Sequence, residues 1–265
     1  MRIAIGIAYD GTAFDGWQSQ PSGNTVQDHL ERALSAIAGN SIRLAGAGRT
    51  DAGTHACAQV AHFDTLAERP GSAWVRGANA LLPSAVAVQW SMPVPDEFHA
   101  RYSASARSYR YVLYKHAVRP ALLAGKTGWF HGELDLEAMR RAASALVGEH
   151  DFSAFRSSEC QARNPVRVME RAEVHGRGPY LFFEFTANAF LHHMVRNIVG
   201  SLVYIGSHRH PPEWMLQVMQ GRDRNRAAPT IAAAGLYLTD VRYDAKWRLP
   251  PFARMMPFGS SEDEA

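Results

Sequence analysis

The sequence is poor in cysteine and has no long apolar run. Its two cysteines, Cys57 and Cys160, do not have the spacing of a metal site, and nothing in the sequence indicates secretion. No stretch reads as a signal peptide or is apolar for long enough to span a membrane. We therefore expect a reduced, cytoplasmic protein that has no membrane partner.

Motifs for nucleotides and metals are also missing. Residues 46–56 contain several glycines, but a dinucleotide fingerprint would need another glycine where Asp51 stands, and a phosphate loop would need Gly-Lys-Ser/Thr. An aspartic protease needs two carboxylates that share a site, and only one loop of this kind occurs. The pairs His192–His193 and His208–His210 lack the i, i+4 spacing of a helical zinc pair. We expect no cofactor and no metal.

The surplus of charge is small. The 265 residues include 28 Lys and Arg against 25 Asp and Glu, which gives a net charge of +3. Three of the acids lie in the terminal segment 262–264, and the rest of the chain carries +6. Arginine predominates among the basic residues, and its planar guanidinium suits phosphates and base edges. This composition agrees with an RNA substrate without requiring one.

The periodicity of apolar residues predicts an α+β protein with two similar halves. In residues 1–105 the expected order is strand, helix, strand, strand, helix, strand, which is the split βαβ arrangement of a ferredoxin-like unit. Residues 106–248 give a similar order with insertions, including a helix over about 190–205, and 249–265 reads as a flexible tail. The other expected elements are strands at 1–10, 57–63, 86–92, 107–114, 166–174, 180–186 and 235–238, and helices at 25–39, 74–82, 134–147 and 211–219.

The segment Gly46–Ala56 has the most distinctive pattern. Glycines allow its backbone to turn sharply and to lie close to a ligand. If the segment is extended between them, Arg49 and Asp51 point to the same side. A carboxylate beside a guanidinium stays ionised, which suits a nucleophile or a base better than an acid. The alternative is a tight surface turn with an exposed Arg–Asp pair, and spacing alone slightly favours it.

Several segments resemble one family, in the same order along the chain. Gly48-Arg49-Thr50-Asp51-Ala52-Gly53-Thr54-His55-Ala56 resembles the catalytic loop of the tRNA pseudouridine synthase A family, which usually has valine in place of Thr54. Further similarities lie in residues 9–18, in Phe98-His99-Ala100-Arg101 and in residues 188–200. The resemblance runs from about Ile3 to Leu238.

This resemblance implies a fold and a set of roles. The two halves would form an extended mixed, largely antiparallel sheet with helices on one side and a catalytic cleft between them. Asp51 would be the catalytic nucleophile and would pair with Arg196, while Tyr109 would stack on the target uracil and could accept its proton. Arg49 would wedge into the RNA stack once the nucleotide is turned out, and Leu236 would pack on the uracil opposite Tyr109.

The same resemblance implies a substrate and an assembly. The family acts on uridines at positions 38–40 of the tRNA anticodon arm, needs no cofactor, and forms a homodimer that shares one tRNA across both subunits. From the residues alone, Tyr109 reads as a half-buried strand residue, Leu236 as core, and Arg196 as a helix residue on the same face as His192 and His193.

Two other classes of protein remain open. A non-catalytic RNA-binding module on the same scaffold would use the loop only to position phosphates and would not need the Asp51 carboxylate. A hydrolase would use Asp51 and His55 as its base. It would give no role to Tyr109 or Arg196.

Overall fold

The computed structural model describes residues 1–252 and 258 and confirms the α+β class. The chain forms two compact units, one made of Met1–Ser105 with the segment from Tyr237 onward, the other of Ala106–Leu236. We refer to them as unit 1 and unit 2. Among the described residues, no helix is both long and apolar enough to cross a membrane.

Unit 1 is built on the strand order β4-β1-β3-β10. The central strand β1 (Arg2–Tyr9) pairs antiparallel with β3 (His55–Asp64) and with β4 (Val86–Val94), and short β2 (Ala45–Gly46) also pairs with β3. The last strand, β10 (Leu236–Tyr243), runs parallel to β3, with Tyr237 opposite His55. The end of the chain thus returns beside the strand that follows the Asp51 loop.

Helix α1 (Val26–Ala38) begins and ends at the residues that the sequence predicts. The Thr25 hydroxyl accepts the N–H of Asp28, and the Asp28 carboxylate accepts the N–H of Thr25, which completes a capping box. Gly39 ends the helix in the left-handed conformation, with φ 74°. This cap anchors the helix whose buried face supports the loop at residues 11–23.

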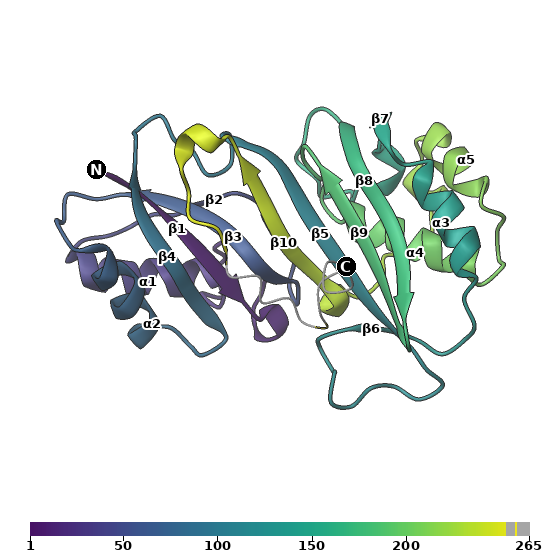
Figure 1. Cartoon of the computed structure of the whole chain (residues 1–265), viewed down its shortest axis with the longest axis horizontal. Helices are drawn as coiled ribbons and strands as arrows, with labels where there is room; N and C mark the ends of the chain where they lie inside the picture. Colours follow the sequence, from purple (N-terminus) through teal and green to yellow (C-terminus); the bar gives the residue numbers. More distant parts are fainter. Residues whose placement is uncertain (253–257, 259–265) are drawn as a thin grey trace. The chain divides into compact units, whose positions relative to one another are not determined.

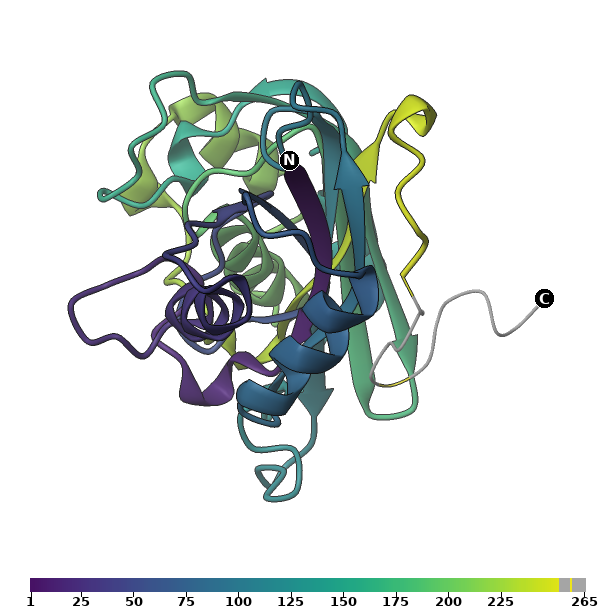
Figure 2. The same ribbon diagram turned by 90° about the vertical axis from the view of Figure 1, so that its left-hand side faces the viewer.

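Both faces of the unit 1 sheet are covered. Helix α1 packs with the π-helical turn η2 (Ala73–Gly77) and with α2 (Ala78–Leu81) on one side of β1, and the segment after β10 lies on the other (Figure 2). On that second side the ring of Trp90 lies against Gly6, where a Cβ would come 2.2 Å from the indole, and Phe252 packs on Trp90 edge-to-face. Every central position of β1 from Ile3 to Ile7 is therefore buried.

Unit 2 has the strand order β5-β9-β8-β7. Strand β5 (Ala104–Lys115) pairs antiparallel with β9 (Tyr180–Ala187) and parallel with short β6 (Gly128–Phe130), while β8 (Val166–Arg177) lies between β9 and β7 (Gly148–Asp151). Helix α3 (Leu136–Ser144) packs against β8 and against α4 (Met194–Gly206), and α5 (Trp214–Gly221) packs beside both helices.

Several predicted boundaries were wrong. The helix expected over 190–205 begins only at Met194, because His193 adopts a left-handed conformation with φ 62° that ends the preceding turn. His192 and His193 therefore do not share a helical face with Arg196. The short strands β6 and β7 were not predicted, since three or four residues are too few to show a period. The tail predicted at 249–265 lies mostly outside the described residues.

Candidate active site

Asp51 stands in the loop that joins β2 to β3, just before a tight turn. Ala52 and Gly53 form the turn, and the N–H of Thr54 donates to the Asp51 carbonyl at 3.0 Å. Gly53 has φ 76°, a conformation that glycine adopts without the strain of a side chain. The turn places Asp51 at the entrance to β3.

The backbone next to Asp51 is held by the loop that follows β1. The Tyr9 hydroxyl and the Thr50 Oγ1 are hydrogen-bonded at 2.7 Å in a buried position. The Trp17 N–H donates to the Thr50 carbonyl at 3.0 Å. Gly16 has φ 92°, and a Cβ there would lie 2.7 Å from the Thr50 carbonyl oxygen, so only glycine fits this approach. These contacts hold the position of Thr50 through both its side chain and its backbone.

Arg49 is exposed, and its side chain is oriented by a chain of amides from α1. Its Nε donates to Gln18 Oε1 at 3.1 Å, and Gln18 Nε2 donates to Gln27 Oε1 at 3.0 Å. Gln27 in turn donates to Glu31 and to the carbonyl of Leu44. Such a relay reduces the number of rotamers that the Arg49 side chain can sample, and it was not predicted from the sequence.

His55 is a packing residue rather than an accessible base. It is only 2% exposed, its Nδ1 accepts the N–H of Gly11 at 3.1 Å, and its ring stacks on Tyr237 with centroids 4.5 Å apart. Burial raises the pKa of the Tyr237 hydroxyl well above its ordinary value, so the phenol stays protonated. A hydrolase that uses His55 as its base would need an open imidazole, and this geometry does not favour it.

In unit 2, Tyr109 lies on β5 opposite Phe185 of β9 and is 8% exposed. Its ring meets the edge of Phe190 at 81°, with centroids 5.0 Å apart. The segment that carries Phe190 lies between β9 and α4, so the signature at residues 188–200 supports Tyr109 as well as supplying Arg196. Aromatic pairs in this edge-to-face geometry restrict the ring plane.

Arg196 lies in the first turn of α4 and holds the segment that leads to Leu236. Its Nε donates to the Ile231 carbonyl at 2.8 Å, and the Tyr111 hydroxyl donates to the next carbonyl, that of Ala232, at 3.0 Å. Burial raises the pKa of Tyr111 strongly, and the nearby positive charge of Arg196 opposes the rise. Leu236, which begins β10, is 6% exposed.

The five residues singled out from the sequence therefore fall into two groups. Arg49 and Asp51 share one loop of unit 1, whereas Tyr109, Arg196 and Leu236 belong to unit 2. The supporting residues Tyr9, Gln18 and Tyr111 were not predicted. For Tyr9 the strand pattern indicated only a core position, and nothing local indicated the hydrogen bond to Thr50.

The carboxylate loop by itself does not define the class of protein. Comparison with known proteins gives that class, an RNA-modifying isomerase, and the family. The family model described as tRNA pseudouridine synthase matches residues 5–103 and 142–244. A tRNA pseudouridine synthase A from Thiobacillus denitrificans is 57% identical over 258 residues, which cover 97% of this chain and 99% of that protein. Another, from Paraburkholderia phymatum, is 55% identical over 260 residues, covering 98% and 97%.

The chain belongs to the tRNA pseudouridine synthase family. A further relative, from Burkholderia cenocepacia, is 57% identical over 251 residues that cover 95% of this chain and 93% of that protein. Membership makes this protein an isomerase that converts uridine to pseudouridine in tRNA. The resemblance drawn from the sequence motifs is confirmed.

Proposed function

We propose that this enzyme isomerises uridines at positions 38–40 of the tRNA anticodon stem-loop and that Asp51 is its catalytic nucleophile. The observation that carries the assignment is the anchored loop. Thr50, directly before Asp51, is bound through its side chain by Tyr9 and through its carbonyl by Trp17. Because this backbone is already held in place, binding of the substrate does not carry the entropy cost of ordering a mobile loop around the carboxylate.

The reaction requires few groups from the protein. Pseudouridine formation breaks the bond between C1′ and N1, forms one between C1′ and C5, and transfers the C5 proton to a base while N1 gains a proton. No electron is gained or lost, and no water is consumed. The carboxylate of Asp51 acts either on the base or on a proton of the sugar, and both routes leave the net reaction unchanged.

The other residues are assigned to binding and proton transfer. Tyr109 stacks on the target uracil and takes part in removing the C5 proton, because a phenol combines a flat apolar face with one polar tip. Leu236 packs on the uracil, and Arg196 supplies a permanent positive charge. Arg49 takes the place of the flipped nucleotide in the RNA stack, where a guanidinium plane can replace a lost base.

The resemblance also supports an assembly and a location. We assign a homodimer that shares one tRNA across both subunits and acts in the cytoplasm. Light scattering tests the first part, since the dimer has twice the 29.3 kDa mass of the chain. A mass of one chain at working concentration would contradict it.

Tritium release tests the assignment of Asp51. An unmodified tRNA transcript labelled at uracil C5 is incubated with the wild-type protein, with Asp51→Asn and with Asp96→Asn, which makes the same chemical change at an exposed carboxylate of unit 1. We expect release by the wild type and by Asp96→Asn, and none by Asp51→Asn. Transcripts with uridine at only one of positions 38, 39 and 40 give the target positions.

Binding measured in parallel separates the alternatives. Asp51→Asn should bind tRNA as tightly as the wild type and should unfold at a similar temperature, because a loop carboxylate contributes little to the core. Release of tritium by Asp51→Asn at the wild-type rate would remove Asp51 from the mechanism. Binding without release by every protein, the wild type included, would favour the non-catalytic RNA-binding module.

A further inference from the structure

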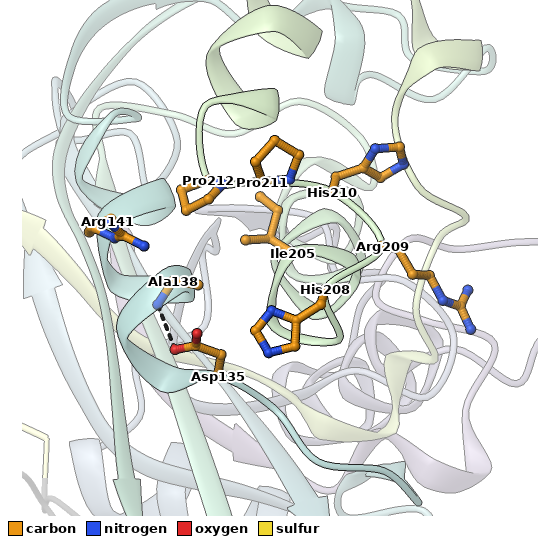
Figure 3. Close-up of a pocket in the computed structure, with 9 residues that line it drawn as sticks. All are labelled: Asp135, Ala138, Arg141, Ile205, His208, Arg209, His210, Pro211 and Pro212. Atoms are coloured by element: carbon orange, nitrogen blue, oxygen red, sulfur yellow. Dashed lines mark hydrogen bonds between the residues drawn. The ribbon is translucent and has the colours of Figure 1, made fainter.

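A cluster of basic side chains lies at the C-terminal end of α4, whereas Arg196 lies at its N-terminal end. A pocket of about 420 Å³ opens between the start of α3 and the turn that joins α4 to α5 (Figure 3). Its lining includes Arg141, His208, Arg209 and His210, with one carboxylate, Asp135. None of these residues belongs to the site proposed above.

The two arginines of this pocket form no ion pair within the part of the chain that the structure describes. Within residues 1–252 and 258, neither the Arg141 nor the Arg209 guanidinium makes a hydrogen bond or an ion pair. Other arginines of unit 2 do: Arg110 pairs with Glu184, Arg140 with Glu137, Arg171 with Glu173 and Arg222 with Asp151. Arg141 and Arg209 lie on opposite sides of the pocket in Figure 3, and the Arg209 guanidinium is turned outward at its rim.

Aromatic rings orient the basic groups on one side. The Arg209 guanidinium lies 4.6 Å from the centroid of the Tyr204 ring, and the His210 ring stacks on Trp214 with centroids 4.0 Å apart and planes 9° apart. An arginine stacked on a ring keeps its in-plane N–H groups available for phosphate oxygens. Interleaved basic and aromatic side chains of this kind are typical of surfaces that bind nucleic acid.

The single carboxylate does not cancel this charge. Asp135 Oδ1 accepts the N–H of Ala138 at 2.9 Å as the N-terminal cap of α3 (Figure 3). The pocket and its rim thus carry two arginines and one carboxylate, and that carboxylate already has a structural role. His208 stands beside Asp135, in a left-handed conformation with φ 60° at the position after α4 where glycine is usual. The imidazole thus adds a donor to the pocket at a position where glycine would be less strained.

We propose that this pocket binds a backbone phosphate of the tRNA substrate, away from the target nucleotide. Ile205 of the pocket lies nine positions after Arg196 on α4, which is about 14 Å along the helix. At a rise of roughly 3 Å per base step in an A-form RNA duplex, that distance corresponds to four or more base pairs. The inference rests on the proposed function, in which the target uridine lies near Arg196. The contact is with RNA beyond the anticodon loop.

The test compares Arg141→Gln/Arg209→Gln with the wild type for equilibrium binding of two RNAs over a series of salt concentrations. One RNA is the full-length tRNA transcript, and the other is a hairpin of its anticodon loop with the adjacent three base pairs. We expect the double variant to bind the full tRNA about tenfold more weakly. Its slope of log K against log salt should be smaller by about 0.7 to 0.9, because one phosphate contact is lost. Its affinity for the hairpin should stay within twofold.

Arg140→Gln is the matched control, because it removes the same charge from the neighbouring residue of α3, whose side chain is bound to Glu137 and to the Val174 carbonyl. If the double variant and this control have equal affinities and salt slopes with full-length tRNA, the pocket binds no phosphate. Equal weakening for both RNAs would overturn the placement beyond the anticodon loop. The binding measurement does not depend on turnover. Failure of the tritium assay would therefore contradict the proposed function, while the binding comparison would still test the phosphate site.

Discussion

The Thr54 hydroxyl is one of several buried polar groups without a hydrogen-bond partner among the described residues, and its removal should stabilise the protein. Thr54 is 1% exposed, and its Oγ1 has no hydrogen-bond partner among the described residues. An unpaired buried hydroxyl costs about 1–3 kcal/mol relative to an apolar group of the same shape. Thr54→Val keeps the shape and restores the residue usual in the family, so the free energy of unfolding should rise by about 1 kcal/mol or more.

Urea denaturation and thermal unfolding would measure this gain. For a protein of this size, 1 kcal/mol corresponds to an increase of ~2–4 °C in the melting temperature. Thr50→Val is the paired control with the opposite sign, because it breaks the 2.7 Å hydrogen bond to Tyr9. It should lower the free energy of unfolding by ~1–2 kcal/mol. A Thr54→Val variant no more stable than the wild type would refute the reasoning, since Oγ1 would then have a partner in solution.

Two further predictions concern the pH dependence of stability and the orientation of Arg49. Burial, aided by the charges of His99 and Arg2, lowers the pKa of His62 to about 4. The unfolded chain binds the proton more readily, so His62 lowers stability as the pH falls from 6.5 to about 4, by roughly 3 kcal/mol in all. Urea titrations at pH 7 and pH 4.5 should show a smaller loss for His62→Gln, and an equal loss would show that His62 titrates normally. Gln18→Ala removes the acceptor of the Arg49 Nε, so kcat for tritium release should fall about five- to tenfold with tRNA affinity within twofold. An unchanged kcat would mean that Gln18 does not orient Arg49.

Local sequence patterns predicted the limits of an element correctly where those limits depend on residues close together in the chain. The helix expected at 25–39 was predicted correctly, because its limits depend on caps made by residues three or four apart, such as Thr25 and Asp28. The start of α4 was not, since apolar periodicity continues through residues 190–193 although His193 leaves the helical conformation. Periodicity reports which side chains are apolar and says little about where a backbone turns.

The sequence alone indicated the family and the order of the longer elements, and it led to the proposal of Asp51 as the catalytic carboxylate, because these inferences depend on residue types at short spacings. Only the tertiary structure decided what supports the candidate site. The Tyr9–Thr50 hydrogen bond joins residues 41 positions apart, and the contact of Arg196 with the Ile231 carbonyl spans 35. β10 returns from the far end of the chain to lie beside β3. Contacts of this kind follow from strand pairing and packing over long separations, and no local pattern of residues specifies them.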